Sequence, residues 1–115
     1  MRNMSFMLTT QQIKDEEKFV TRRLGWWFLE RGDLVMACEK CQGLKKGEKI
    51  NRIRPIEIIQ ASPSILNTIT RGDVMLEGFE GMAPEQFVEM FCKHMKCKPD
   101  EVVNRIEFRY PTPYF

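Results

Sequence analysis

Residues 102–110, VVNRIEFRY, limit the possible folds of this chain more than any other stretch. Their side chains alternate between two faces, with Arg105 and Glu107 on one face and Ile106 and Phe108 on the other. This two-residue period is that of a β-strand. A strand needs neighbours to pair its backbone groups, so the chain is expected to contain a sheet.

Four further segments are expected to supply those neighbours. Residues 5–9, 18–23, 32–40 and 53–62 carry apolar or β-branched residues and lie beside turn-forming or polar residues. Pro55 in the last of them indicates an edge, a bulge or the start of a strand, because proline has no N–H to donate to a sheet.

Helical segments are short. Thr10 is a candidate cap for a helix near residues 10–16, and Ser62 or Ser64 for another helix after the fourth strand. A helical turn and a glycine-rich loop follow, before a helix that begins near Pro84. Since the strands mostly meet through loops, a regular βαβ repeat is excluded. The pattern predicts an α+β domain in which a curled, barrel-like sheet of about five strands carries three short helices.

The length of 115 residues predicts one domain over residues 1–115, with the proline-broken PTPYF at 111–115 as a tail. The net charge of +2 does not by itself indicate a partner. No apolar run approaches the ~20 residues of a membrane span, and the N-terminus lacks the pattern of a signal peptide. A cytoplasmic location is therefore expected.

A cationic segment leads into both tryptophans of the chain. Its residues are Lys18, Thr21, Arg22, Arg23, Trp26 and Trp27. Arginine holds phosphate through paired hydrogen bonds, and indole faces stack on bases, so the segment is typical of a pocket for a flat anion such as a nucleotide. The alternative is that the cations are solvated and one indole packs in the core, and the residues themselves leave both interpretations open.

Two further groups pose the same choice. Glu77 stands between an apolar run and Gly78, which fits either a partly buried carboxylate in a site or a solvated turn. Lys40, Lys45 and Lys46 belong to a glycine-containing loop that either follows a phosphate backbone or is simply solvated. The Walker phosphate-binding spacing is absent.

The cysteines allow a weaker alternative, a zinc site. Cys38 and Cys41 have metal-ligand spacing, and Cys92, His94 and Cys97 lie further along the chain. On a strand, however, a separation of three residues directs two thiols to opposite faces. We therefore expect neither a metal nor a cofactor, and His94 is the single candidate for histidine-based catalysis.

In combination, the blocks VTRR-x-GWW, QGLKKGEK, EGF-x-GM and RIEF resemble ASCH-domain proteins of the small stand-alone kind common in bacteria and phages. The resemblance covers roughly residues 5–110. It implies the PUA-like fold, a small β-barrel with helices at its rim. It also implies a cleft proposed to bind RNA or a modified nucleoside, lined by basic and aromatic residues near the first two strands.

One ASCH branch consists of amidohydrolases that remove the acetyl group of N4-acetylcytidine. Their working residues are a lysine, a threonine three positions later and a distant glutamate, which the resemblance places on Lys18, Thr21 and Glu77. It implies that Thr21 positions or activates Lys18 and that Glu77 passes a proton to the leaving amine. Arg23 also fits the strand pattern of the family.

We therefore expect an RNA- or nucleotide-binding module, with RNA or a modified nucleoside as its partner and no membrane. The cationic strand and one tryptophan are expected to form one wall of a cleft, with Glu77 opposite. Deacetylation of N4-acetylcytidine is the alternative function, and a zinc-binding interaction protein is the third. The residues expected to contact nucleic acid are Arg22, Arg23, Trp26, Trp27, Lys40, Lys45 and Lys46.

Overall fold

The computed structural model of the chain describes residues 1–41 and 43–112, so residues 113–115 of the expected tail lie outside the described residues. Within these ranges one sheet holds the strands β1 (Arg2–Ser5), β2 (Val20–Arg23), β3 (Leu34–Cys38), β4 (Arg52–Ile65) and β5 (Val102–Arg109). The strand order is β1-β3-β4-β5-β2. β1 runs parallel to β3 and the other pairs are antiparallel.

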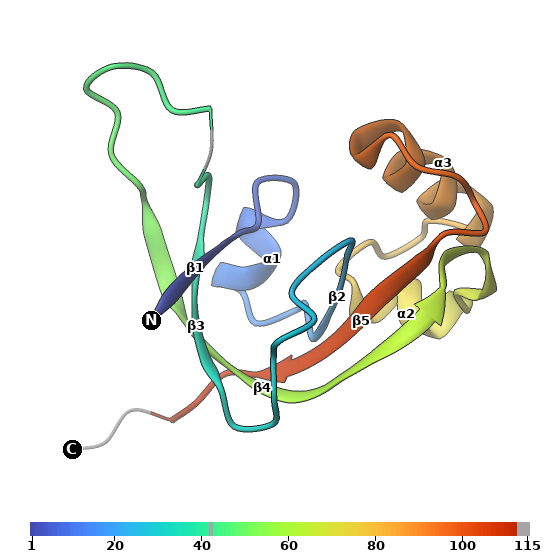
Figure 1. Cartoon of the computed structure of the whole chain (residues 1–115), viewed down its shortest axis with the longest axis horizontal. Helices are drawn as coiled ribbons and strands as arrows, with labels where there is room; N and C mark the ends of the chain where they lie inside the picture. Colours follow the sequence, from blue (N-terminus) through green and yellow to red (C-terminus); the bar gives the residue numbers. More distant parts are fainter. Residues whose placement is uncertain (42, 113–115) are drawn as a thin grey trace.

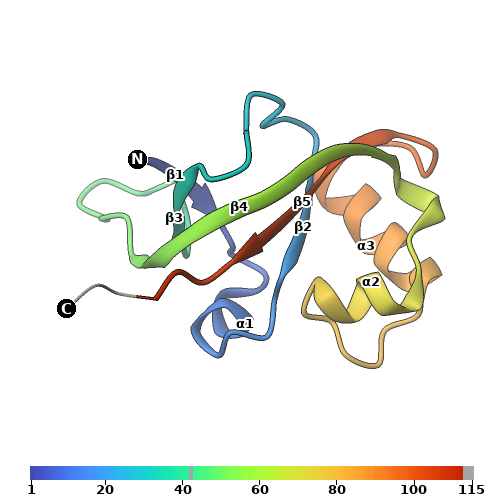
Figure 2. The same cartoon turned by 90° about the horizontal axis from the view of Figure 1, so that it is seen from below.

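The helices in the described ranges are α1 (Thr10–Lys14), α2 (Arg71–Leu76) and α3 (Pro84–Met95), with a 3₁₀ turn η1 (Leu66–Thr68). In Figures 1 and 2, α1 lies on one side of β2, and α2 and α3 lie on the other side. The expected α+β class, with a curled sheet of five strands and three helices, is confirmed.

β4 organises the sheet because it pairs with β3 through its first half and with β5 through its second half. The pairing with β3 runs from Arg52 to Glu57, and the pairing with β5 runs from Glu57 to Ile65. Pro55 is therefore tolerated, since β4 has a partner on only one side at that position. A register shift between Ile58 and Gln60 marks a bulge, which bends the strand.

Two expected boundaries are wrong. The first strand is Arg2–Ser5 rather than residues 5–9, because the chain turns after Phe6, whose carbonyl accepts a hydrogen bond from the Thr9 N–H at 3.0 Å. No helix starts at Ser62 or Ser64: β4 continues to Ile65, since that backbone pairs with β5. Long-range pairing overrides the local capping signal there.

The core consists of two apolar clusters. The first includes Phe6, which follows β1, Ile13 of α1, Ile58 of β4 and Phe108 of β5. The second includes Phe87 and Phe91 of α3 together with Val74 of α2. Each cluster removes apolar surface from water and so fixes one group of helices against the sheet.

No helix within residues 1–41 and 43–112 combines the length and the apolar character that crossing a membrane requires.

Candidate functional site

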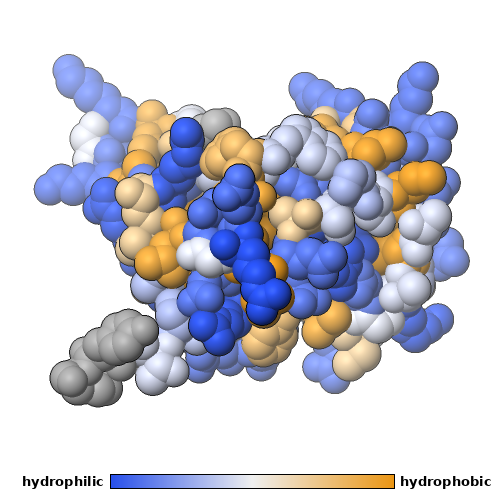
Figure 3. All heavy atoms as spheres, turned by 60° about the horizontal axis from the view of Figure 1, so that its bottom comes forward, coloured by the Kyte–Doolittle hydropathy of each residue, from blue (hydrophilic) through white to orange (hydrophobic). Residues whose placement is uncertain are grey.

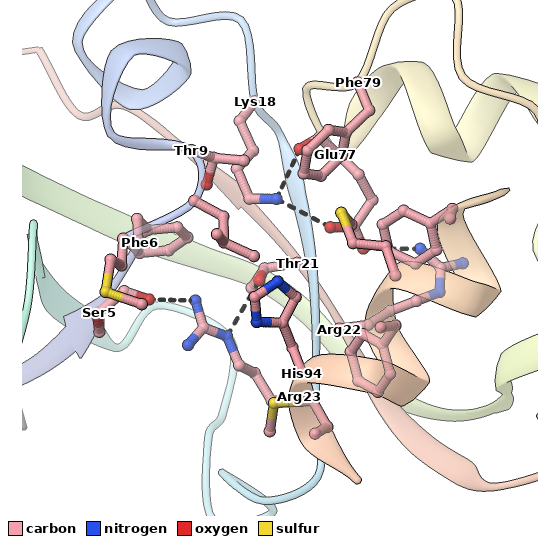
Figure 4. A pocket seen from close by; sticks show the side chains of 16 residues that line it. Ser5, Phe6, Thr9, Lys18, Thr21, Arg22, Arg23, Glu77, Phe79 and His94 are labelled. Carbon is pink, nitrogen blue, oxygen red and sulfur yellow. Dashed lines mark hydrogen bonds and ion pairs between the residues drawn. The ribbon is translucent and has the colours of Figure 1, made fainter. Parts of the chain in front are cut away.

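A cavity of about 280 Å³ lies where the two apolar clusters meet. It is close to the lower end of the size range of small-molecule pockets, roughly 300 Å³. Phe6 of the first cluster and Phe87 and Phe91 of the second contribute to its wall, and the cationic segment lies between them (Figure 4). We call this cavity the pocket. Its polar lining residues are Ser5, Thr9, Lys18, Thr21, Arg22, Arg23, Glu77 and His94.

Lys18 and Glu77, 59 residues apart in the chain, meet in the pocket. The Lys18 Nζ donates to Glu77 Oε1 at 2.8 Å and to the Glu77 carbonyl at 2.6 Å, and both side chains are almost fully buried (Figure 4). Desolvation lowers the pKa of the Lys18 ammonium, and Arg23 and Arg22 add to that effect, whereas Glu77 opposes it.

The backbone on both sides of Lys18 is fixed. Lys18 precedes β2 by two residues, and the Phe19 N–H donates to the Leu76 carbonyl in the last turn of α2 at 2.8 Å. The Tyr110 hydroxyl donates to the Lys18 carbonyl. Strand alternation therefore does not govern the direction of this side chain, which turns toward the end of α2.

Glu77 is the C-terminal cap of α2, and Gly78 brings the following backbone against α1. Gly78 has φ of +96°, and a Cβ at this position would lie 3.0 Å from Gln12 Cγ. The Gln12 amide also donates to the Gly78 carbonyl at 3.1 Å. Only glycine combines this backbone conformation with so close an approach, so Gly78 sets the position of Glu77 relative to α1.

Thr21 and Arg23 share one face of β2. The Arg23 Nε donates to Thr21 Oγ1 at 3.1 Å, and Nη2 donates to the Ser5 carbonyl at 2.7 Å. The guanidinium also lies over the Phe6 ring, 4.8 Å from its centroid. Burial lowers the pKa of Arg23 to about 10, so the side chain stays cationic at neutral pH.

Arg22 has a different environment from the one expected of a nucleic-acid contact. Its Nη1 donates to Glu77 Oε2 at 3.0 Å and its Nη2 to Asp73 Oδ2 at 2.6 Å. Both terminal nitrogens are thus occupied by carboxylates. The sequence pattern contained one signal for Asp73, which lies four positions before Glu77 and so shares one helix face with it.

Neither tryptophan lines the pocket, so the expected indole wall is not part of this cavity. Trp26 packs against the first apolar cluster, and Trp27 is half exposed. The aromatic wall is formed by phenylalanines instead: Phe6, Phe79, Phe87 and Phe91. His94, exposed near the end of α3, lines the pocket although its position on the helix gave little reason to expect this (Figure 4).

The lysine loop contributes no side chain to the pocket. Lys40 lines a second hollow together with Lys49, and Lys45 and Lys46 are exposed. Met7 lines both the second hollow and the pocket, so the two are adjacent.

The four cysteines are free thiols, and no three histidine, cysteine or acidic side chains within residues 1–41 and 43–112 gather as metal ligands. The zinc alternative therefore has no site in this part of the chain.

Comparison with known proteins identifies the fold. No protein-family model and no curated protein matches the sequence. A solved ASCH domain from Lactobacillus crispatus JV V101 superposes with a TM-score of 0.67 at 16% identity, over 94% of this chain and 77% of the other. A protein of the family DUF984 from Enterococcus faecalis V583 gives a TM-score of 0.65 at 11% identity, over 96% and 76%. The protein therefore has the fold of an ASCH domain.

Proposed function

We propose that this protein binds a nucleotide, alone or as part of a short RNA, in the pocket. The observation that carries the proposal is the state of Arg23. Its guanidinium is held by Phe6, Thr21 and Ser5, yet no carboxylate of the described residues lies within ion-pair distance of it. A fixed arginine beside a cavity, with no carboxylate in direct contact, is a preorganised site for an oxyanion.

The remaining charges of the pocket support an anionic ligand. Lys18, Arg22 and the more exposed Arg105 carry three positive charges against the two carboxylates of Glu77 and Asp73, so this linked group keeps one positive charge. Arg23 adds a second positive charge. The Thr21 oxygen accepts from Arg23, which leaves the hydroxyl proton available to a ligand.

The apolar part of the pocket supports a flat ring as the other half of the ligand. Phe79, Phe87 and Phe91 form a continuous aromatic group, with centroids 5.8 Å and 6.1 Å apart. Base–aromatic contact contributes roughly 1–3 kcal/mol per base in single-strand binders. A phosphate on Arg23 and a base against this group describe a nucleotide.

The second hollow supports RNA as the larger ligand. It adjoins the pocket at Met7 and presents Lys40 and Lys49, and the exposed Lys45 and Lys46 belong to the same loop. A strand whose nucleotide occupies the pocket would meet these cations with its next phosphates.

Binding of cytidine, cytidine monophosphate and a short single-stranded RNA, measured by calorimetry at fixed salt, tests the proposal. The monophosphate should bind more tightly than the nucleoside in the wild-type protein. Arg23→Gln should weaken binding of the monophosphate at least about tenfold, the loss of one charge-assisted contact. Arg31→Gln removes an exposed arginine outside the pocket and should bind as the wild type does. Equal affinities in Arg23→Gln and the wild type would defeat the proposal.

A second candidate is hydrolysis of N4-acetylcytidine, because Lys18, Thr21 and Glu77 all line the same pocket. Water would add to the acetyl carbonyl and the C–N bond would break, which yields acetate and cytidine. The lowered pKa of Lys18 favours the neutral amine that can accept a proton from water, and the 2.8 Å contact lets that proton pass to Glu77 and on to the leaving nitrogen.

Chromatography of N4-acetylcytidine after incubation with the protein tests this candidate. Thr21→Val, which removes the hydroxyl at constant shape, should reduce turnover strongly, and Thr21→Ser should retain most of it. Lys18→Ala should abolish turnover. The absence of free cytidine with the wild-type protein across the pH range would remove the candidate and leave nucleotide binding to be judged alone.

A further inference from the structure

Two carboxylates lie side by side on α2. Asp73 is in its first turn and Glu77 is its cap, and the Glu77 N–H donates to the Asp73 carbonyl at 2.8 Å. Side chains four positions apart share one face of a helix, so two negative charges in this arrangement repel each other.

Two arginines create the same problem on the sheet. Arg22 of β2 and Arg105 of β5 are directly opposite in the antiparallel register. Like charges in such cross-strand pairs are destabilising. Neither the acidic pair nor the basic pair is favourable by itself.

In the structure the acidic and the basic side chains alternate, so that each carboxylate lies between two cations. Asp73 accepts from Arg22 at 2.6 Å and from Arg105 at 2.7 Å and 3.0 Å. Together with Lys18 and Glu77 this produces an alternating series of five charges, which we call the charge ladder. Its order is Arg105, Asp73, Arg22, Glu77 and Lys18.

The charge ladder runs from the surface into the pocket. The Lys18, Arg22 and Glu77 side chains are only 2–4% exposed, whereas those of Asp73 and Arg105 are 17% and 23% exposed. The buried part holds two cations and one anion, so Asp73 supplies the charge that balances it.

Asp73 also determines how the two terminal nitrogens of Arg22 are divided between carboxylates. An arginine and a carboxylate prefer to form two parallel hydrogen bonds. Without Asp73, both arms of Arg22 would be available to Glu77 and would compete for the Oε1 that now faces Lys18. Because Asp73 takes Nη2, only Nη1 reaches Glu77, and the second carboxylate oxygen stays with Lys18.

We propose that Asp73 is a positioning residue of the pocket: by holding one arm of Arg22, it keeps Glu77 directed at Lys18. What this positioning serves rests on the proposed function, but its test does not need a ligand. Titratable or charged side chains near Lys18 come from α2, β2, α3 and the residue after β5: Glu77, Arg22, Arg23, His94 and Tyr110.

The test is the titration midpoint of the Lys18 amine, followed by NMR in the full-length, ligand-free protein labelled at lysine and assigned by the signal lost in Lys18→Arg. In Asp73→Asn the midpoint should fall below that of the wild type, since a negative charge is lost and Glu77 is drawn toward Arg22. In Arg105→Gln it should rise, since a positive charge is lost. Glu57→Gln, which removes a carboxylate bound to Arg109 outside the pocket, should leave it unchanged.

The direction in which the Lys18 midpoint moves in Asp73→Asn distinguishes a positioning role of Asp73 from a purely structural one. Loosening of the site would admit water and raise the midpoint, because burial is the main cause of its depression. An unchanged or raised midpoint in folded Asp73→Asn overturns the proposal. If that variant does not fold, Arg105→Lys, which keeps the charge, should retain the wild-type midpoint while Arg105→Gln raises it. Equal midpoints in those two variants overturn the proposal as well.

Failure of the proposed function is a separate outcome. If the wild-type protein binds neither nucleoside, nucleotide nor RNA, the proposed function falls, but the midpoints still report on Asp73. If nucleotides bind and the Asp73→Asn midpoint does not move down, only the positioning role falls.

Discussion

At the scale of single residues, the pocket depends on burying an ammonium, a guanidinium and one carboxylate together. Removing such groups from water costs several kcal/mol each, and their attraction offsets that cost only while every partner is present. Glu77 is the shared partner, since it accepts hydrogen bonds from both Lys18 and Arg22. Its charge therefore matters more to folding than the charge of either cation alone.

Glu77→Gln should lower the free energy of unfolding by about 3–5 kcal/mol, because two buried cations lose their common counter-charge. Glu57→Gln breaks the more exposed pair with Arg109 and should cost less than about 1 kcal/mol. Urea denaturation at neutral pH compares the two. A loss in Glu77→Gln no larger than in Glu57→Gln would show that the pair is not energetically coupled to folding.

A family resemblance in the sequence predicted Lys18, Thr21 and Glu77 as residues of one site, and all three line the pocket. It did not reveal the surroundings of Arg22. Asp73 can bind both Arg22 and Arg105 only because these two arginines, 83 positions apart in the chain, pair in the sheet. No local sequence pattern predicts that pairing. The polar groups that interact across the sheet were therefore the part that required the three-dimensional structure.

At the scale of secondary-structure elements, the end of α2 is the most tightly constrained segment of the site. Gly78 combines φ of +96° with the approach of Gln12, whereas Gly81 has φ of +82° and no atom within 4 Å of the place that a Cβ would occupy. Both glycines have a backbone conformation that is strained for other residues, but only Gly78 is also crowded, so a comparison of the two distinguishes strain from crowding.

Gly78→Ala should destabilise the protein by more than Gly81→Ala does. A left-handed conformation costs a residue with a side chain roughly 1–3 kcal/mol, and only position 78 adds a clash with α1. The measurement is the difference between the two midpoints of urea unfolding. Equal losses would mean that α1 yields to the added methyl group at no cost.

The bounds of an element could be predicted where its side chains alternate over many residues. The predicted bounds were wrong where contacts with distant parts of the chain set the end of the element. The alternation of residues 102–110 corresponds to β5, Val102–Arg109. The serines at 62 and 64 resembled helix caps, yet pairing with β5 keeps them in β4. A cap is a preference of about 1 kcal/mol, which several sheet hydrogen bonds outweigh.

At the scale of the whole molecule, two apolar clusters share one sheet and the pocket occupies their junction. On the face seen in Figure 3, hydrophobic residues are scattered among hydrophilic ones, so much of the surface is mixed in character. The charge ladder links β2, β5 and α2, and it makes global stability sensitive to acid.

Stability should fall as the pH drops from about 4 to about 2, partly because Asp73 must be protonated. Arg105 and then Arg22 hold the pKa of Asp73 at about 2, below the value of roughly 3.9 in an unfolded chain. The unfolded state therefore binds more protons than the folded state in this pH window. The ion pairs of Asp73 contribute about 2 kcal/mol to the free energy of unfolding above the window, and this contribution is lost as the pH falls through it. Urea unfolding as a function of pH should show a shallower acid limb for Asp73→Asn than for Glu57→Gln. Parallel limbs would contradict the assignment.

The division of β4 between two partners has a mechanical consequence. Glu57, next to the bulge, is the residue of β4 that pairs with both β3 and β5, so the bend of the strand falls where the sheet changes partner. β5 spans the same junction, because its Val103 packs in the second cluster and its Phe108 packs in the first. The spacing between Phe6 and the phenylalanines of α3 is therefore braced by two paired strands rather than by one hinge.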